Sequence, residues 1–321
     1  MNWWSSMGGA NSDTLGSRLI VGSGFIGSAL AASSSRRGHR TRVLSRSGRS
    51  GTVRDECAPV DWCVGDAADQ DLMRHALQDI DEVFWCVGSR LPAESESDLV
   101  GAISDRCTPL ELALDVLREM SASPKLYLFS SGGTVYGEST GGPVPESAPT
   151  NPITAYGIAN VSAELVARRY SNETGNPVTI FRCANVYGPG QQAGRSQGLL
   201  AATLSAVVSS EPLVIYGDGQ SLRDYVFIDD VVRMVEGIAA LESAPDVVNI
   251  GTQTGSTVDE VVRLVEKCLQ LEVVCEYRDV RRSDLRSIVL DTSLVRSLTG
   301  VTPVTLEDGI RLTILDAEGR K

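Results

Sequence analysis

The sequence predicts an α/β fold: a doubly wound parallel sheet followed by a smaller C-terminal domain. Between residues 18 and 183, short apolar runs alternate with longer helical patterns, as in successive β-α-β units with helices on both faces of one sheet. A glycine-rich turn joins the first apolar run to the first helical pattern. After Val186 the alternation gives way to Gly- and Pro-rich segments, which indicates a second, less regular unit.

The short apolar runs are expected to form the strands. In chain order they are RLIV at 18–21, RVLS at 42–45, VDWCV at 60–64, EVFWCV at 82–87, KLYLFS at 125–130 and VTIFRC at 178–183. Helical patterns fill 25–37, 100–120 and 153–171. Farther along, LVIY at 213–216 and VVNI at 247–250 are predicted strands, and 226–241, 257–270 and 304–317 are predicted helices.

The composition argues against several classes of protein. The net charge of −12, from 41 acidic and 29 basic residues, disfavours a nucleic-acid partner. The seven cysteines form no CxxC pair and only two histidines occur, so we expect reduced thiols and no metal site. No run of 18 apolar residues occurs and the N-terminus lacks a signal-peptide pattern, so we expect no membrane partner and a cytoplasmic location.

The glycine turn has the pattern of a dinucleotide-binding fingerprint. Gly22, Gly24 and Gly27 follow the first strand, and Phe25 and Ile26 begin the helical pattern. Glycines at this spacing let backbone amides approach a pyrophosphate at a helix N-terminus. The strand, turn and helix around GxGxxG are the context that the fingerprint requires. The sequence therefore predicts a Rossmann-type cofactor site.

The end of the second strand bears on which cofactor binds there. An NAD site usually has Asp or Glu about 20 residues after the fingerprint, to bind the ribose 2′-hydroxyl. This chain has Ser45 and Arg46 instead. A guanidinium and hydroxyls suit a 2′-phosphate, so the sequence favours NADP(H). NAD, bound without the usual carboxylate, is the alternative.

These elements suggest a division into domains. Residues 1–17 lack periodicity and are expected to form a flexible tail. Residues 18–186 would form the dinucleotide-binding domain, to which 224–252 return. Residues 187–223 and 253–321 would form the substrate-binding domain.

From residue 18 onward, the chain resembles the extended short-chain dehydrogenase/reductases, in particular nucleotide-sugar epimerases and dehydratases of the UDP-glucose 4-epimerase type. The resemblance rests on successive blocks: GFIG at 24–27, GDAAD at 65–69, VFWCVG at 83–88, SSGGTVYG at 130–137, NPITAYG at 151–157, RCANVYGPG at 182–190, YGDGQSLRDYVFIDDV at 216–231 and NIGT at 249–252. The order and spacing of these blocks together make the resemblance specific.

The resemblance implies roles for individual residues. Asp66 and Ala67 would contact the adenine, and Val87 and Gly88 would line the cofactor cleft. Tyr156 would be the catalytic acid/base. The residues themselves agree, since Asn151-Pro152 is a favourable helix start and would place Tyr156 in the first or second turn.

The resemblance extends to the substrate end and to assembly. Asn185, Arg223 and Arg281 would bind a nucleotide diphosphate, with Arg282 as the competing choice for the last contact. Apolar stripes at 100–120 and 153–171, the latter with Ile158, Val161 and Leu165, would pack on the sheet. In the family the equivalent helices also form a four-helix bundle between subunits, so a homodimer is expected.

Two departures from the family pattern concern the catalytic centre. Four residues after Tyr156 the family has a lysine that acidifies the phenol and binds the nicotinamide ribose, whereas this chain has Asn160. Asn160 can hydrogen-bond a ribose hydroxyl but supplies no charge. An arginine from elsewhere in the fold, or the oxidised cofactor, would have to supply it.

The second departure is Gly132, which lies where the family has Ser or Thr to bond the reacting hydroxyl. Ser131 or Thr134 could serve from adjacent positions. No acidic residue occurs at 132–134, so dehydration ranks below epimerisation or ketone reduction.

We therefore expect an NAD(P)-dependent nucleotide-sugar epimerase, most simply a 4-epimerase, that combines a tyrosine acid/base with transient hydride transfer. One alternative is an NADPH-dependent nucleotide-4-ketosugar reductase. Another is a catalytically silent cofactor-binding homologue, because Asn160 replaces the lysine.

Overall fold

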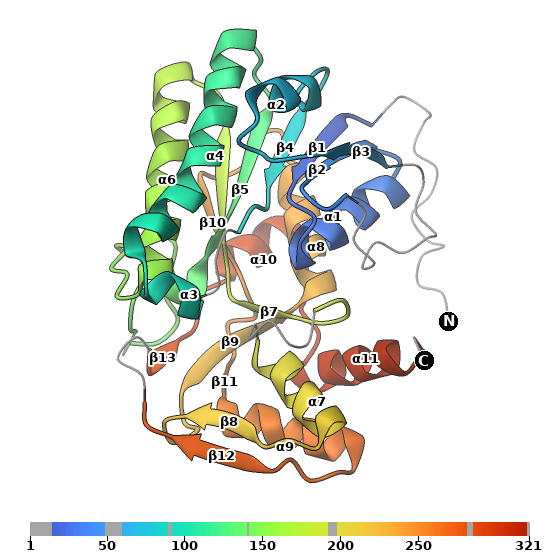
Figure 1. Cartoon of the computed structure of the whole chain (residues 1–321), viewed down its shortest axis with the longest axis vertical. Helices are drawn as coiled ribbons and strands as arrows, with labels where there is room; N and C mark the ends of the chain where they lie inside the picture. The colour runs from blue at the N-terminus through green and yellow to red at the C-terminus, as the bar shows by residue number, and fades with distance from the viewer. Residues whose placement is uncertain are drawn as a thin grey trace.

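The computed structural model describes residues 15–48, 60–88, 92–139, 141–191, 198–280 and 285–319. A seven-stranded sheet forms the centre of the molecule (Figure 1). Its strands, in spatial order, are β10 (Val247–Ile250), β6 (Val178–Cys183), β5 (Lys125–Ser131), β4 (Glu82–Trp85), β1 (Ser17–Val21), β2 (Arg40–Ser45) and β3 (Asp61–Val64). Every neighbouring pair is parallel. The predicted parallel sheet is confirmed.

Helices cover both faces of this sheet. Ile20 packs in one hydrophobic cluster with side chains of α1 (Phe25–Arg36) and α8 (Ile228–Ala239). Its neighbours Leu19 and Val21 pack in another cluster with α2 (Gln70–Ala76), α4 (Leu99–Met120) and α6 (Ala155–Thr174). Successive side chains of a strand point to opposite faces, so the sheet is buried on both sides and the doubly wound fold class is confirmed.

Most of the remaining elements build a smaller layer below the central sheet in Figure 1. A four-stranded sheet contains β7 (Asn185–Tyr187), β9 (Leu222–Phe227), β11 (Gly255–Thr257) and β13 (Ser287–Ile288), and β8 (Leu213–Tyr216) pairs with β12 (Cys275–Arg278). Helices α7 (Leu199–Ser209), α9 (Val258–Leu269) and α11 (Leu306–Gly319) pack with these strands. In contrast, α3 (Pro92–Glu96), α5 (Gly132–Val135) and α10 (Ser293–Thr299) contact helices or strands of the central layers. Since β6 ends at Cys183 and β7 begins at Asn185, the smaller layer starts directly at the carboxyl end of the central sheet.

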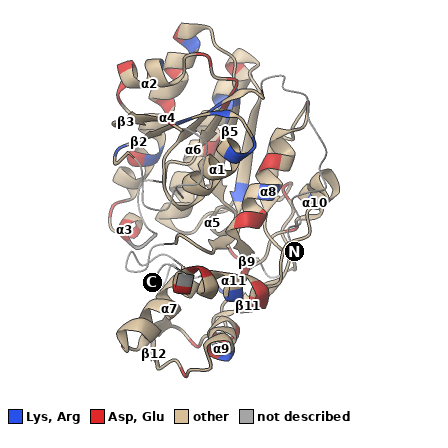
Figure 2. Ribbon diagram, turned by 90° about the vertical axis from the view of Figure 1, so that its right-hand side faces the viewer, with Lys and Arg blue, Asp and Glu red and all other residues tan. Residues whose placement is uncertain are grey.

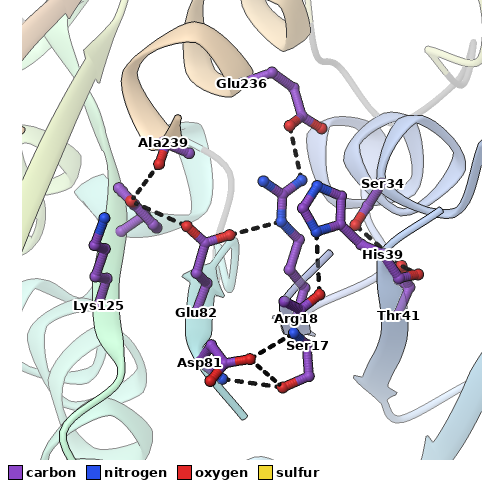
Figure 3. Close-up of polar contacts among 12 residues, drawn as sticks. Ser17, Arg18, Ser34, His39, Thr41, Asp81, Glu82, Lys125, Glu236 and Ala239 are labelled. Atoms are coloured by element: carbon purple, nitrogen blue, oxygen red, sulfur yellow. Dashed lines mark hydrogen bonds and ion pairs between the residues drawn. The ribbon is translucent and has the colours of Figure 1, made fainter. Parts of the chain in front are cut away.

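A buried ion triad ties the opposite end of the sheet together (Figure 3). Arg18 of β1 donates through Nε to Glu82 of β4 and through Nη1 to Glu236 of α8, both at 2.7 Å. Its guanidinium also lies over the Phe84 ring, 5.2 Å from the centroid. Removing one partner of such a buried set leaves an uncompensated charge, so we assign this triad to stability.

Figure 2 shows acidic residues on helices at both ends of the molecule, including α2, α9 and α11. Within the described ranges, no helix combines the length and the apolar composition that crossing a bilayer requires.

Candidate functional site

In the glycine turn between β1 and α1, Gly22 and Gly27 are closely packed, whereas Gly24 has open space beside it. Gly22 has φ +99°, in the region that favours glycine, and its N–H donates to the carbonyl of Leu44 at 2.8 Å. A β-carbon on Gly27 would overlap the carbonyl oxygen of Gly22, whereas one on Gly24 would meet no atom within 4 Å. The N-terminus of α1 is therefore bare at Gly24, which fits a pyrophosphate.

Phe25 and Ile26 pack on the side of the smaller layer. Both are half-buried and lie against its hydrophobic cluster, which contains Tyr187 and Phe227. They hold the first turn of α1 against that layer and so position the glycines between the two parts of the fold.

The end of β2 lies beside this turn. Ser45 is buried and its hydroxyl donates to the carbonyl of Gly48 at 3.1 Å, so it stabilises its own loop. Arg46 is exposed at the next position. An exposed guanidinium at this edge of the sheet can reach an anionic group on a bound ribose.

The ends of β3 and β4 complete the same edge. Asp66 is exposed and accepts a hydrogen bond from the N–H of Ala68 at 2.9 Å, while Ala67 is buried. Val87 is half-buried against the sheet, and Gly88 is exposed with open space where a β-carbon would lie. The carboxyl ends of β1 to β4 thus carry every described residue predicted to bind the cofactor, apart from Tyr156 and Asn160, and their geometry fits a dinucleotide.

Tyr156 lies in the first turn of α6, but the predicted helix start is wrong. The helix begins at Ala155, and Thr154 caps it by accepting from the N–H of Gly157 at 2.9 Å. Asn151 lies four residues before the helix, and its N–H donates to the carbonyl of Val135 at 3.0 Å. Tyr156 is half-buried at this end of the helix.

Asn160 lies one turn farther along the same face of α6. Asn160 is 2% exposed, and its Nδ2 donates to the Tyr156 carbonyl oxygen at 2.9 Å. One more turn along, Glu164 is also 2% exposed and accepts from Arg182 at 2.6 Å and from Ser130 at 2.6 Å. This face of α6 is therefore buried and polar, and it carries the acid/base candidate at its N-terminal end.

The neighbours of Gly132 explain why no Ser or Thr hydroxyl occurs at this position. A β-carbon there would lie 2.5 Å from Leu290 Cδ1 and 2.9 Å from the carbonyl oxygen of Arg182. A serine or threonine side chain has no room at 132 while these neighbours stay in place.

The two hydroxyls predicted to substitute lie on either side of this glycine. Ser131 is half-buried at the end of β5, and its Oγ and Asn185 Oδ1 both lie within 4 Å of the position a β-carbon on Gly133 would take. Thr134 Oγ1 is buried, and among the described residues it has no hydrogen-bond partner. Ser131 and Asn185, from separate strands, are therefore brought together.

A cavity of about 260 Å³ opens beside Asn185. It is lined by residues of β7, α7, β8, β9 and α9 and their flanking turns: Asn185, Val186, Tyr187, Gly198, Leu199, Leu200, Tyr216, Ser221, Arg223, Tyr225 and Val258. Arg223 donates through Nη1 to the carbonyl of Leu222 at 2.9 Å and through Nη2 to that of Leu285. Arg281 and Arg282 lie outside the described residues.

Sequence reasoning missed three hydroxyls of this cavity, from Ser221, Tyr225 and Tyr216. Ser221 and Tyr225 flank Arg223 at two-residue spacing, the period at which side chains share one face of a strand. That alternation in SLRDY was the available signal.

Comparison with known proteins agrees with this geometry. The sequence profile of the NAD dependent epimerase/dehydratase family matches residues 19–251. Among curated relatives, a UDP-glucose 4-epimerase from Mycolicibacterium smegmatis is 27% identical over 311 residues, covering 92% of this chain and 96% of that protein. A putative UDP-glucose 4-epimerase from Methanocaldococcus jannaschii is 29% identical, over 63% of this chain and 65% of that protein. A dTDP-4-dehydro-6-deoxyglucose reductase from Escherichia coli is 31% identical, over 58% and 59%.

Solved structures share the whole fold. UDP-glucose 4-epimerase from Thermotoga maritima, solved with UDP-glucose, superposes with a TM-score of 0.87 at 28% identity and covers 95% of this chain and 99% of that one. The UDP-glucose 4-epimerase of Thermus thermophilus, solved with NAD, gives 0.85 at 26% identity over 95% and 100%. Because the family profile spans residues 19–251 and the fold agrees, this chain belongs to the NAD dependent epimerase/dehydratase family.

Proposed function

We propose that this chain is a nicotinamide-dinucleotide-dependent epimerase of nucleotide-diphosphate sugars that acts at C4. The observation that carries the proposal is the placement of Tyr156. It lies in the first turn of α6, and a β-carbon on its neighbour Gly157 would lie 2.7 Å from the carbonyl oxygen of Thr134. Tyr156 is therefore carried by the helix that contacts the turn after β5, and at the end of β5 Ser131 Oγ lies near Asn185, which lines the cavity.

The chain's own residues divide the work as follows. Tyr156 Oη accepts the proton of the sugar hydroxyl and returns it, and Ser131 or Thr134 orients that hydroxyl by a hydrogen bond. Asn185 and Arg223 bind the diphosphate, where a guanidinium forms short charge-assisted bonds. When bound, the nicotinamide cofactor supplies reversible hydride transfer at the sugar carbon.

The cofactor is NAD or NADP(H). The exposed Arg46 at the end of β2 favours NADP(H), whereas the Thermus thermophilus relative was solved with NAD. The residues around Gly24 and Gly88 accommodate the shared part of either molecule.

Turnover of nucleotide sugars tests the proposal. The purified chain is incubated with UDP-, dTDP-, GDP- and CDP-sugars and each cofactor, and product sugars are separated by chromatography. We expect Tyr156→Phe to lower kcat by about 10²- to 10⁴-fold, the range for loss of a general acid/base. Tyr277→Phe is a matched control because Tyr277 is 53% exposed on β12 and does not line the cavity. Full turnover by Tyr156→Phe would refute the assignment.

A ketosugar reductase is the second candidate. The Escherichia coli reductase matches more than half of this chain, and the absence of an acidic residue at 132–134 is compatible with reduction. A reductase consumes NADPH in proportion to product, whereas an epimerase leaves the cofactor balance unchanged. A silent homologue, suggested by Asn160, would bind cofactor and nucleotide sugar without turning over either.

A further inference from the structure

The turn between β8 and β9 connects two residues that line the cavity. It spans residues 217–220, directly after Tyr216 and directly before Ser221. Gly217 and Gly219 have φ +86° and +76°, in the region that favours glycine, so the chain reverses tightly here. The separation of the Tyr216 and Ser221 side chains therefore depends on the conformation of this turn.

The backbone of the turn is anchored to two neighbouring elements of the smaller layer, β12 and α9 (Figure 1). The N–H of Gly217 donates to the carbonyl of Arg278 in β12 at 2.8 Å. The carbonyl of Gly219 accepts from the N–H of Asp259, in the first turn of α9, at 3.1 Å. Each half of the turn thus has its own anchor.

The Asp259 carboxylate packs against the second half of the turn. Its Oδ2 accepts a hydrogen bond from Gln220 Nε2 at 2.8 Å, and a β-carbon on Gly219 would overlap its Oδ1. Gly219 is buried and Asp259 is half-buried, so this contact is partly shielded from water. The exposed Tyr277 donates to Oδ1 at 3.1 Å and not to the oxygen that binds Gln220. Oδ2 is therefore the oxygen that holds the turn.

The first turn of α9 is itself fixed relative to the cavity. Val258 begins the helix and lines the cavity. Thr257 caps the helix in a capping box, in which its N–H donates to Glu260 Oε2 at 2.9 Å. β11 ends at Thr257 and pairs with β9, the strand that carries Arg223. Asp259 therefore joins the turn to a helix start whose place beside the cavity is set by strand pairing.

We propose that Asp259 is a positioning residue for the nucleotide-diphosphate part of the substrate, because its carboxylate holds the 217–220 turn and so fixes Tyr216 and Ser221 around the cavity. Asp259 does not line the cavity, so it acts through the turn and not by contact with substrate. A turn that is ordered before binding lowers the entropic cost of binding. Affinity, and not the chemical step, therefore depends on Asp259. This inference rests on the proposed function, which takes the cavity as the nucleotide-diphosphate site.

Hydrogen exchange followed by mass spectrometry tests the contact in the chain without ligand. In Asp259→Ala we expect amides of the peptide 216–223 to exchange about three- to tenfold faster, as for the loss of one hydrogen bond. Asp259→Asn keeps an oxygen that can accept from Gln220, so its exchange should stay close to that of the unaltered protein. Glu260→Ala is the matched control, because Glu260 is an exposed carboxylate of the same helix turn that binds the Thr257 N–H.

Nucleotide binding gives the functional readout. Calorimetric titration with UDP, dTDP, GDP and CDP measures Kd, and turnover of the matching sugars separates KM from kcat. Asp259→Ala should raise Kd and KM about three- to tenfold, the cost of ordering one or two side chains on binding, and leave kcat unchanged. Gln220→Ala should have the same effect, and the double variant should add little because both changes remove one interaction. Asp259→Asn should restore Kd, and Glu260→Ala should leave it unchanged.

Unchanged exchange and unchanged Kd in folded Asp259→Ala would overturn the inference, and if that variant does not fold, the same result in Gln220→Ala would do so. Equal losses of affinity in Asp259→Ala and Glu260→Ala would also overturn it, because they would reflect a general weakening of α9. Faster exchange of the turn in a chain that binds none of the four nucleotides would instead refute the proposed function and leave Asp259 as the residue that holds this turn.

Discussion

Two adjacent glycines at the end of β5 offer a sharp test of the packing that shapes the site. A β-carbon on Gly132 would lie 2.5 Å from Leu290 Cδ1 and 2.9 Å from the carbonyl oxygen of Arg182. On Gly133 the nearest atoms, of Asn185 and Ser131, would be at ordinary contact distances of 3.7 and 3.9 Å. Both glycines lie in α5 and neither requires a positive φ. The two positions therefore differ mainly in the space available.

We expect Gly132→Ala to lower the free energy of unfolding by about 1–3 kcal/mol, the usual cost of overpacking. Leu290 is itself buried and the Arg182 carbonyl is backbone, so neither neighbour moves easily. Gly133→Ala should instead be neutral or stabilising by up to about 1 kcal/mol, because alanine reduces the freedom of the unfolded chain. The difference between the variants is thus about 1–4 kcal/mol.

Urea unfolding followed by circular dichroism measures this difference through the transition midpoints. Equal midpoints for the two variants would show that position 132 has room for a side chain. The absence of Ser or Thr there would then need another cause, and the assignment of the orienting hydroxyl to Ser131 or Thr134 would lose its structural basis.

Four further predictions concern cofactor choice, stability, pH and assembly. Arg46→Ala should weaken NADPH binding by about tenfold and leave NADH binding unchanged in fluorescence titrations, and an unchanged NADPH affinity would favour NAD. Glu164→Gln removes the carboxylate that pairs with Arg182 and leaves a buried charge without its partner. The free energy of unfolding should therefore fall by about 3–5 kcal/mol in urea denaturation. Burial lowers the pKa of His39 from 6.5, so the folded chain binds fewer protons than the unfolded chain in that range. Stability should therefore fall as the pH decreases through about 6.5, and less so in His39→Gln. We expect a homodimer through α4 and α6, where Leu165 is 62% exposed, and light scattering that gives a single monomer mass would contradict it.

The local pattern of apolar residues was sufficient to predict most strands of the central sheet. The runs at 18–21, 42–45, 60–64, 82–87, 125–130 and 178–183 all contain strands, because apolar residues that are buried on both faces leave a nearly continuous signal. The exact start of α6 was not predictable in this way. Asn151 and Thr154 are both acceptable caps, and only the folded chain, in which Thr154 accepts from the N–H of Gly157, decides between them. Leu165 belongs to an apolar stripe yet is mostly exposed, since burial depends on what covers a helix and not on its own sequence.

The fold class, the glycine turn and the place of Tyr156 near a helix start could be predicted from the residues, because each depends on positions that are close together in the chain. The surroundings of that tyrosine, in contrast, depend on how the folded chain packs. On the face of α6 that carries Tyr156 and Asn160, Glu164 is paired with Arg182 of β6 at 2.6 Å, and Asn160 Nδ2 donates to the Tyr156 carbonyl oxygen at 2.9 Å. Long-range electrostatic contacts of this kind leave no periodic signal in the sequence. The loss of a lysine could therefore be seen from the residues alone, whereas the hydrogen bond that engages Asn160 became visible only in the folded chain.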